Sequence, residues 1–237
     1  MSNTPLRRKR TGIDQTIQNI HEYSISPQTR ELYLHSSYNT SVDDEEPGVE
    51  YRMATKFIKN IHILDEESRS NVLVHMHTTG GNWTDGMAMF DTVIFSKSAF
   101  TILAYSMASS MSGIFLQCAD RRVLMPNCEF MIHHGSIFLN ANSLAVKSAV
   151  EMNEHYCKLM LQIFAKKAIM GPYFKNKNYD HEKVVDFIDK KIKEYSDWYM
   201  TAEEAVNYGF ADGILGQKGF ESISKIRVGR KYKEQIC

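Results

Sequence analysis

Cysteine and proline are scarce in this sequence, and it contains no Cys-x-x-Cys pair. Of 237 residues, four are Cys and five are Pro. The cysteines stand singly at Cys118, Cys128, Cys157 and Cys237, without the His and Cys spacing that is typical of a zinc site. A disulfide-stapled miniprotein is therefore excluded. We expect buried reduced thiols, which are typical of a cytoplasmic protein.

The sequence also lacks an excess charge of either sign and a long apolar run. Lys plus Arg and Asp plus Glu each number 28, so no overall basic field exists to hold a polyanion, and a nucleic-acid partner is disfavoured. The longest apolar run, around 99–105, is far shorter than the ~18 residues of a membrane span. The N-terminus has no apolar signal region. We therefore expect no membrane association and no export.

One pattern suggests a metal site and is weak. In His75-Met76-His77, two imidazoles lie on one face of a predicted strand, as a metal pair would require. No carboxylate or Cys follows at ligand spacing, so ordinary strand-end histidines are the favoured interpretation. We expect no bound metal.

The chain divides into one large central region with polar segments around it. Residues 1–28 are polar and contain the basic cluster 7–10, which favours a flexible N-terminal arm. Residues 36–47 include the acidic run 43–46 and are expected to form a solvated loop. Residues 218–237 form a C-terminal tail of mixed basic and apolar character. At roughly 150 residues per domain, the intervening 29–217 suit a single domain.

Strand and helix patterns alternate through this region. Strands are predicted at 31–35, 71–78, 100–105, 122–125 and 129–133, and helical apolar spacing occurs around 53–61, 87–94, 111–118, 143–167 and 184–192. Repeated strand, helix, strand order with apolar strands implies right-handed crossovers and a mostly parallel sheet covered on both faces. The predicted fold class is α/β.

Three loops at strand ends carry groups that could perform chemistry. The small-residue turn 108–113 contains Ser109, Ser110 and Ser112, and a Ser in such a place is more often a helix N-cap than a nucleophile. Thr79-Gly80-Gly81 exposes amides that suit an oxyanion, although a tight turn is the commoner reason for paired glycines. Strand 129–133 ends in His133 and His134, where a general base could lie, with a carboxylate from the later loop at Asp197.

Several spaced motifs together resemble one known family. Ser-Ser-Met at 109–111, Leu-Met-Pro-Asn at 124–127 and Met-Ile-His at 131–133 are followed by a segment at 197–212. That segment reads Asp-Trp-Tyr-Met-Thr-Ala-x-Glu-Ala-x-x-Tyr-Gly-x-x-Asp. The set is similar to the proteolytic subunit of the Clp protease (ClpP), over roughly 31–215. The resemblance implies the ClpP/crotonase-like fold, with 29–217 as the serine peptidase domain and 143–167 as a long handle helix.

The resemblance assigns roles by position in the motifs. The nucleophile would be Ser110, which precedes Met, the general base His133, which follows Met-Ile, and the orienting acid Asp197. Backbone N–H groups of Gly81 and Met111 would form the oxyanion hole. No metal or nucleotide cofactor is implied for this chemistry.

The implied protein is an ATP-dependent Clp-type serine endopeptidase that acts inside a homo-oligomeric chamber. The chamber would be a heptameric ring, or two rings joined through the handle helices. The chain has no Walker motif, so unfolding would be supplied by an AAA+ ATPase partner, and the substrates would be polypeptides. The competing interpretations are a non-catalytic ring subunit, another crotonase-superfamily enzyme and a Ser-Lys peptidase, and the presence of Ser110, His133 and Asp197 disfavours them.

The sequence departs from the family pattern at several positions. Ser106 and Ser112 replace glycines of the nucleophile turn, and Thr79 replaces the Pro before the glycine pair. Tyr195-Ser196 replaces the Asp-Arg pair that helps to join two rings. These departures indicate a divergent member in which an ion-pair contact between rings at that place is absent.

Overall fold

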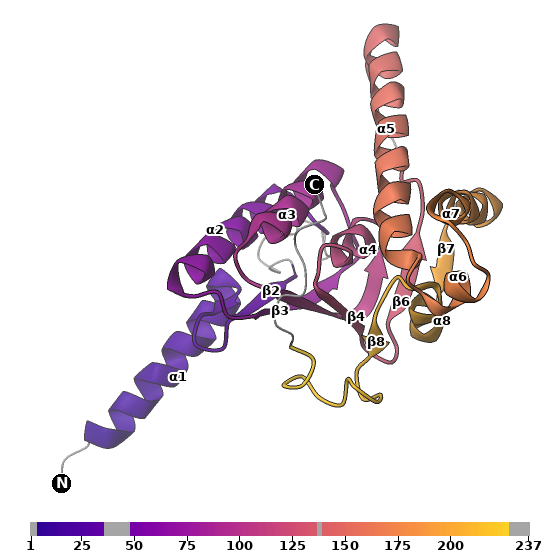
Figure 1. Cartoon of the computed structure of the whole chain (residues 1–237). Coiled ribbons are helices and arrows are strands. Elements are labelled where there is room, and N and C mark those ends of the chain that lie inside the picture. The colour runs from indigo at the N-terminus through magenta and orange to yellow at the C-terminus, as the bar shows by residue number, and fades with distance from the viewer. Residues whose placement is uncertain (1–3, 36–47, 137–138, 228–237) are drawn as a thin grey trace.

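A computed structural model describes residues 4–35, 48–136 and 139–227, with side chains described from residue 12 onward. Helices and strands alternate through most of the chain (Figure 1). The helices are α1 Thr4–Tyr23, α2 Tyr51–Glu67, α3 Trp83–Phe95, α4 Met111–Leu116, α5 Ser143–Ala168, α6 Pro172–Asn176, α7 His181–Tyr195 and α8 Ala202–Tyr208. The strands are β1 Ile25–Ser26, β2 Glu31–Leu34, β3 Val72–Thr78, β4 Phe100–Ser109, β5 Arg121–Leu124, β6 Glu129–Ile132, β7 Trp198–Met200 and β8 Gly213–Ile214.

The eight strands form one mostly parallel sheet that branches at β4. The main path runs β1-β2-β3-β4-β5-β8, and only its first pair, β1 with β2, is antiparallel. The first half of β4 pairs with β5, and its second half pairs with β6, which in turn pairs antiparallel with β7. The α/β class with a mostly parallel sheet, predicted from the sequence, is confirmed.

Side chains alternate between the two faces of the sheet along each strand, and both faces are buried. On β3, Val72, Val74 and Met76 belong to the main core, which they share with apolar residues of the helices α2 to α5. Leu73 points to the other face, where it packs in a small cluster with Leu103, Val123 and Ile226. The second face is therefore covered in part by the C-terminal segment rather than by a helix.

Polar side chains mark where the helices begin. Asn82, Asn142 and Asp180 accept a hydrogen bond from a backbone N–H of the first turn of α3, α5 and α7, respectively. Thr201 and Glu204 form a capping box at α8. These caps fix the point at which each loop turns into a helix, and the loops before α3 and α4 carry candidate site residues.

The terminal segments contain more structure than the sequence predicts. Residues 1–28, predicted as a flexible arm, include α1 and β1. Within the segment 218–237, predicted as a tail, Ile226 is fully buried and Arg227 donates to the carboxylate of Glu31. The predicted acidic loop 36–47 lies outside the described residues.

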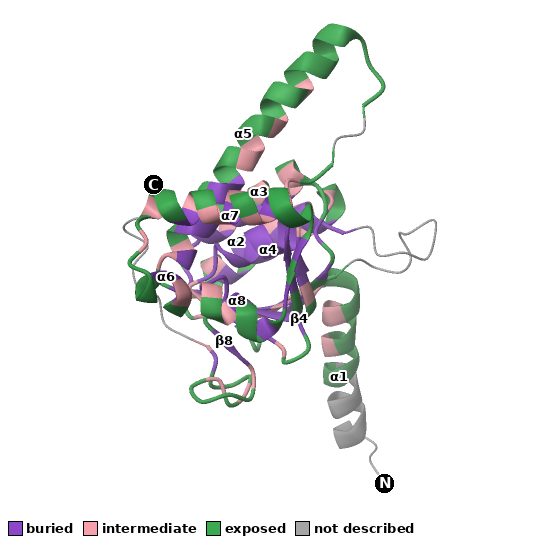
Figure 2. Cartoon of the chain, turned by 90° about the vertical axis from the view of Figure 1, so that its right-hand side faces the viewer, coloured by how far each residue is buried: buried purple, intermediate pink, exposed green. Residues whose placement is uncertain are grey.

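The N-terminal half of α5 extends beyond the rest of the molecule (Figures 1 and 2). Several apolar side chains of this half are exposed, including Leu144 at 76%, Val150 at 45% and Met152 at 50%. The C-terminal half is buried at Met160, Phe164 and Ala168. One helix thus anchors in the core and presents an apolar surface outside it. Among the described residues, no helix is long and apolar enough to cross a membrane.

Candidate active site

Ser110 lies on a sharp turn between β4 and α4. It has φ +55° and ψ −128°, a backbone conformation that non-glycine residues rarely adopt. Its amide donates to the carbonyl of Met131 on β6 at 3.0 Å, and its own carbonyl accepts from Ile114 in α4. Such strain is held by its surroundings and clusters at functional sites. The turn has the strand-to-helix geometry that exposes a nucleophilic serine in serine hydrolases.

The structure brings Ser110, His133 and Asp197 together in one hydrogen-bonded chain. Nε2 of His133 lies 2.8 Å from Oγ of Ser110, and Nδ1 of His133 lies 3.0 Å from Oδ1 of Asp197. In the tautomer with the proton on Nδ1, His133 donates to Asp197 and its Nε2 accepts the Ser110 O–H. This is the arrangement in which an imidazole can take a proton from a hydroxyl.

The strand registers explain why these three residues meet. On β6 and β7, Ile132 pairs with Trp198, so the next antiparallel position sets His133 opposite Asp197. On β4 and β6, Ser109 pairs with Met131, so the next parallel position sets Ser110 beside Ile132. Residues separated by 64 positions along the chain therefore become neighbours.

The paired glycines lie directly beside the Ser110 turn. Gly80 and Gly81 have φ of +109° and +140°. A Cβ on Gly80 would lie 2.6 Å from the carbonyl oxygen of Ser109 and 3.0 Å from the amide nitrogen of Met111. The carbonyl of Gly80 accepts from the amide of Val49 at 2.5 Å, which fixes the loop from its other side. Only glycine permits this close approach.

Both predicted oxyanion-hole residues line the cavity that contains Ser110 and His133. This cavity has a volume of about 430 Å³, and Gly81 and Met111 form part of its wall. Met111 is the first residue of α4, where amide groups have no partner within the helix. The assignment of these two amides to an oxyanion stays a prediction.

The alternative residues of each motif lie differently. Ser109 and Ser112 are 7% and 0% exposed. Nε2 of His134 lies 3.3 Å from the Asp189 carboxylate of α7, away from the nucleophile turn. Ser110 and His133 are thus the serine and histidine that contact each other.

Sequence reasoning missed the residues that shape the rest of the cavity. The rings of Trp83 at the start of α3 and Tyr156 on α5 are stacked, with centroids 4.9 Å apart. Met111, Ile114 and Met160 add further apolar surface to the same wall. The available signal for Trp83 was an aromatic residue two positions after a glycine pair.

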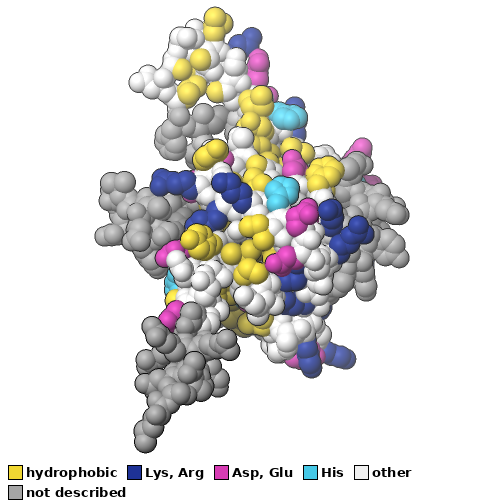
Figure 3. Space-filling view, turned by 90° about the vertical axis from the view of Figure 1, so that its left-hand side faces the viewer, with side chains coloured by type: hydrophobic (Ala, Val, Ile, Leu, Met, Phe, Trp, Pro, Cys, Tyr) yellow, Lys and Arg dark blue, Asp and Glu magenta, His cyan; other side chains and the backbone are white. Residues whose placement is uncertain are grey.

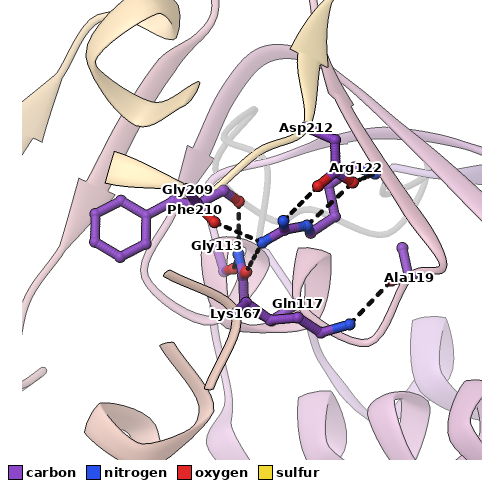
Figure 4. A network of polar contacts seen from close by, with 8 residues as sticks. All are labelled: Gly113, Gln117, Ala119, Arg122, Lys167, Gly209, Phe210 and Asp212. Carbon is purple, nitrogen blue, oxygen red and sulfur yellow. Dashed lines mark hydrogen bonds and ion pairs between the residues drawn. The ribbon is translucent and has the colours of Figure 1, made fainter. Parts of the chain in front are cut away.

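A buried polar network holds the far end of α4 (Figure 4). The side-chain amide of Gln117 donates to the carbonyls of Gly113, at 2.9 Å, and Phe210, at 3.1 Å. Its oxygen accepts from Arg122 at 2.8 Å. The helix that follows the candidate nucleophile is therefore tied to β5 and to the segment after α8.

An ion pair completes this network. The guanidinium of Arg122 donates to both oxygens of Asp212, and the amide of Arg122 donates to Asp212 Oδ2 at 2.7 Å. Burial acts to raise the pKa of Asp212, but the charge and hydrogen bonds of Arg122 outweigh it, so that pKa lies below its ordinary value. Nearby, burial lowers the pKa of Lys167, whose ammonium donates to the carbonyl of Ala119.

His75 takes part in an aromatic cluster. Its ring stacks on Tyr33 with centroids 4.8 Å apart, and its Nδ1 lies 2.7 Å from the hydroxyl of Tyr105. Burial lowers the pKa of His75 and, with a hydrogen bond to Glu31, raises that of Tyr33 to about 12. Across the described ranges, no group of three or more His, Cys, Asp or Glu side chains could hold a metal ion.

The sheet and the linked Ser, His and Asp define a class, the α/β proteins with the residue set of serine hydrolases. A sequence model of the Clp protease family matches residues 45–218. The chain therefore belongs to the Clp protease family, a family of serine peptidases, as the sequence motifs predict.

Relatives at modest identity agree with this assignment. The ATP-dependent Clp protease proteolytic subunit of Deinococcus radiodurans is 26% identical over 172 residues, which are 71% of this chain and 77% of that protein. The subunit of the same name from Ligilactobacillus salivarius is 28% identical over 169 residues, 70% of this chain and 78% of the relative. That of Streptococcus gordonii is 29% identical over 170 residues, 70% and 80% of the two chains. These identities mark a divergent member.

Proposed function

We propose that this chain is a serine endopeptidase that cleaves peptide bonds through an acyl-enzyme. The observation that carries the proposal is the continuous contact from Ser110 through His133 to Asp197. Membership of the Clp protease family supports it independently. Neither a metal nor a nucleotide is required for this chemistry.

Each step uses a group of the candidate active site. His133 Nε2 takes the proton as Ser110 Oγ bonds to the peptide carbonyl carbon, and the oxyanion accepts hydrogen bonds from the amides of Gly81 and Met111. The imidazolium, held by Asp197, then gives its proton to the leaving amine as the C–N bond breaks. Water, deprotonated by His133, attacks the ester and releases the acid and free Ser110.

We further infer that several copies of this chain form a chamber. A separate AAA+ ATPase would unfold the substrates and deliver them to it. The three relatives carry the name ATP-dependent Clp protease proteolytic subunit, and this chain contains no Walker motif. The exposed apolar half of α5 supplies a surface for contact between copies. Short peptides should therefore be cleaved unaided, and folded proteins only with the ATPase and ATP.

The proposal is tested with a fluorophosphonate, which reacts with activated serines. One label per chain is expected, on the peptide that contains Ser110, together with hydrolysis of short peptides. Removal of a triad nucleophile costs on the order of 10⁶ in rate, so Ser110→Ala should abolish both signals while the circular dichroism spectrum is retained. Ser109→Ala is the matched control and should still be labelled. Labelling of Ser110→Ala, or an unreactive wild-type chain, would contradict the proposal.

A further inference from the structure

A fully buried side chain that the proposed mechanism does not use contacts the turn at Ser110. Ser112, in α4, is 0% exposed. The amide of Ser109 donates to Ser112 Oγ at 2.9 Å, and the same hydroxyl donates to the carbonyl oxygen of Ser109 at 2.7 Å. One hydroxyl thus satisfies both backbone groups of the residue just before Ser110.

These backbone groups lie on the side of β4 that faces β3, next to the last pairing of the two strands. The pairing of β3 with β4 extends to Thr78 opposite Ala108. The amide of Ser110 is directed to the other side, toward Met131 of β6. Neighbouring residues of a strand direct their N–H and C=O groups to opposite sides, so those of Ser109 face the side on which β3 ends. Buried backbone groups require a partner, and Ser112 Oγ bonds to both groups of Ser109 at the end of the region where β3 and β4 pair.

The contact matters because the next residue is strained. Ser110 has φ +55°, and such a conformation persists only where the surrounding structure determines it. Strand β6 holds the amide of Ser110, while Ser112 holds both polar groups of Ser109. Without the Ser112 hydroxyl, both of these hydrogen bonds to the residue before Ser110 would be lost.

We propose that Ser112 is a positioning residue for the nucleophile. Its hydroxyl forms hydrogen bonds with the amide and the carbonyl of Ser109 and so keeps Ser110 Oγ in line with His133. The inference rests on the proposed function, because it concerns the rate at which Ser110 reacts. Ser112 has no exposed surface and is not part of the cavity wall, so it acts through the turn and not on the substrate.

Ser112→Ala removes the hydroxyl and keeps Cβ. Misplacement of a reacting atom by about 1 Å can cost on the order of 10²-fold, so kcat for a short peptide should fall roughly 10- to 100-fold. KM should stay nearly unchanged, and the rate of fluorophosphonate labelling should fall with kcat. Ser112→Thr retains a hydroxyl and should recover most of the rate.

A matched control separates positioning from general stability. Ser98 is also 0% exposed, and its hydroxyl donates to Asp65 at 2.8 Å and accepts from Arg30 at 2.9 Å, at the opposite end of β4 from Ser110. Ser98→Ala therefore removes a comparable buried hydroxyl and should leave kcat and the labelling rate unchanged. Rates are taken per folded chain, counted by near-ultraviolet circular dichroism. Ser112→Cys, which fills the same space with a weak donor, replaces the alanine variant if that variant unfolds.

The outcomes distinguish this inference from the proposed function. If Ser112→Ala matches the wild type in kcat, or if Ser98→Ala loses as much, the positioning role is overturned while the peptidase assignment stands. If the wild-type chain is not labelled at Ser110, the proposed function fails first. A fall in kcat confined to Ser112→Ala, with recovery in Ser112→Thr, supports the positioning role of Ser112.

Discussion

Gly80 allows two backbone segments to approach each other more closely than a side chain would permit. A Cβ there would lie 2.8 Å from Cβ of Ser110 and 2.6 Å from the carbonyl oxygen of Ser109, and Gly80 itself has φ +109°. Gly80→Ala should therefore lower the free energy of unfolding by roughly 1–3 kcal/mol. Because the displaced atoms belong to the nucleophile turn, peptidase activity should fall by about 10²-fold or more. Thermal melting and peptide hydrolysis measure the two effects.

Gly12 in α1 provides the control for this substitution. A Cβ on Gly12 meets no atom within 4 Å. Gly12→Ala should leave activity unchanged and stabilise the helix by about 0.5–1 kcal/mol at most. Equal activity in Gly80→Ala and Gly12→Ala would refute the close approach at the candidate site.

At this scale, residue patterns alone did not identify the site. Three serines share the small-residue turn, and two histidines follow β6, so composition could not separate Ser110 from Ser109 or Ser112, or His133 from His134. The family motifs made that choice. The strand registers supply the physical reason, and registers between β4, β6 and β7 depend on pairing across the whole fold, which a local pattern does not contain.

Helix α4 has only six residues and depends on the network at its end. Asp212→Asn would leave the buried Arg122 without its ionised partner. The free energy of unfolding should fall by about 3 kcal/mol. This is the lower end of the range for a broken buried ion pair, because the side chain of Asp212 is itself 33% exposed. Chemical denaturation measures this change, and Asp186→Asn on α7 is a control. A loss below about 0.5 kcal/mol would show that the network does not hold α4.

The same ion pair predicts the response to acid. The pKa of Asp212 is lower in the folded chain than its ordinary value, so its contribution to stability is complete above the unfolded value of about 3.9 and is lost as pH falls through the folded value. Stability of the wild type should therefore decline more steeply below about pH 4 than that of Asp212→Asn. Denaturant midpoints measured between pH 3 and pH 6 test this difference. Parallel declines in both proteins would contradict it.

Element length explains several of the elements that were predicted or missed, although the 20-residue α1 was missed because its sequence is polar. The sequence predicts a helix over 143–167, and α5 covers Ser143–Ala168, because many turns repeat the apolar spacing. The elements β1, α6, β7 and β8 have two to five residues, too few to show a period, and were missed. Strand β4 is longer than predicted since its small and polar end pairs with β6.

On the face shown in Figure 3, basic and acidic side chains are interspersed, and apolar side chains lie along the projecting α5 at the top as well as in the middle of the face. Several exposed apolar side chains on one projecting helix are typical of an interface. We predict that the chain sediments as a heptameric ring or as two such rings, with α5 in the contact between rings.

Substitutions on α5 test this assembly. Val150→Glu together with Met152→Glu places charges on its exposed apolar surface and should dissociate paired rings into single ones, as seen by sedimentation velocity. Glu151→Gln, on the same turn and also exposed, is the control. A stable, active monomer of the wild-type chain would contradict the predicted assembly.

The 64-residue separation between His133 and Asp197 has a consequence for the order of events during synthesis. A ribosome that has reached α6 has already produced the turn at Ser110 and the strand that precedes His133, but not the carboxylate. Strand β7 can pair with β6 only after α5, α6 and α7 have been made, which requires closure of a long loop. The acid therefore joins the other two residues late, so through most of its synthesis the nascent chain lacks the carboxylate that orients His133.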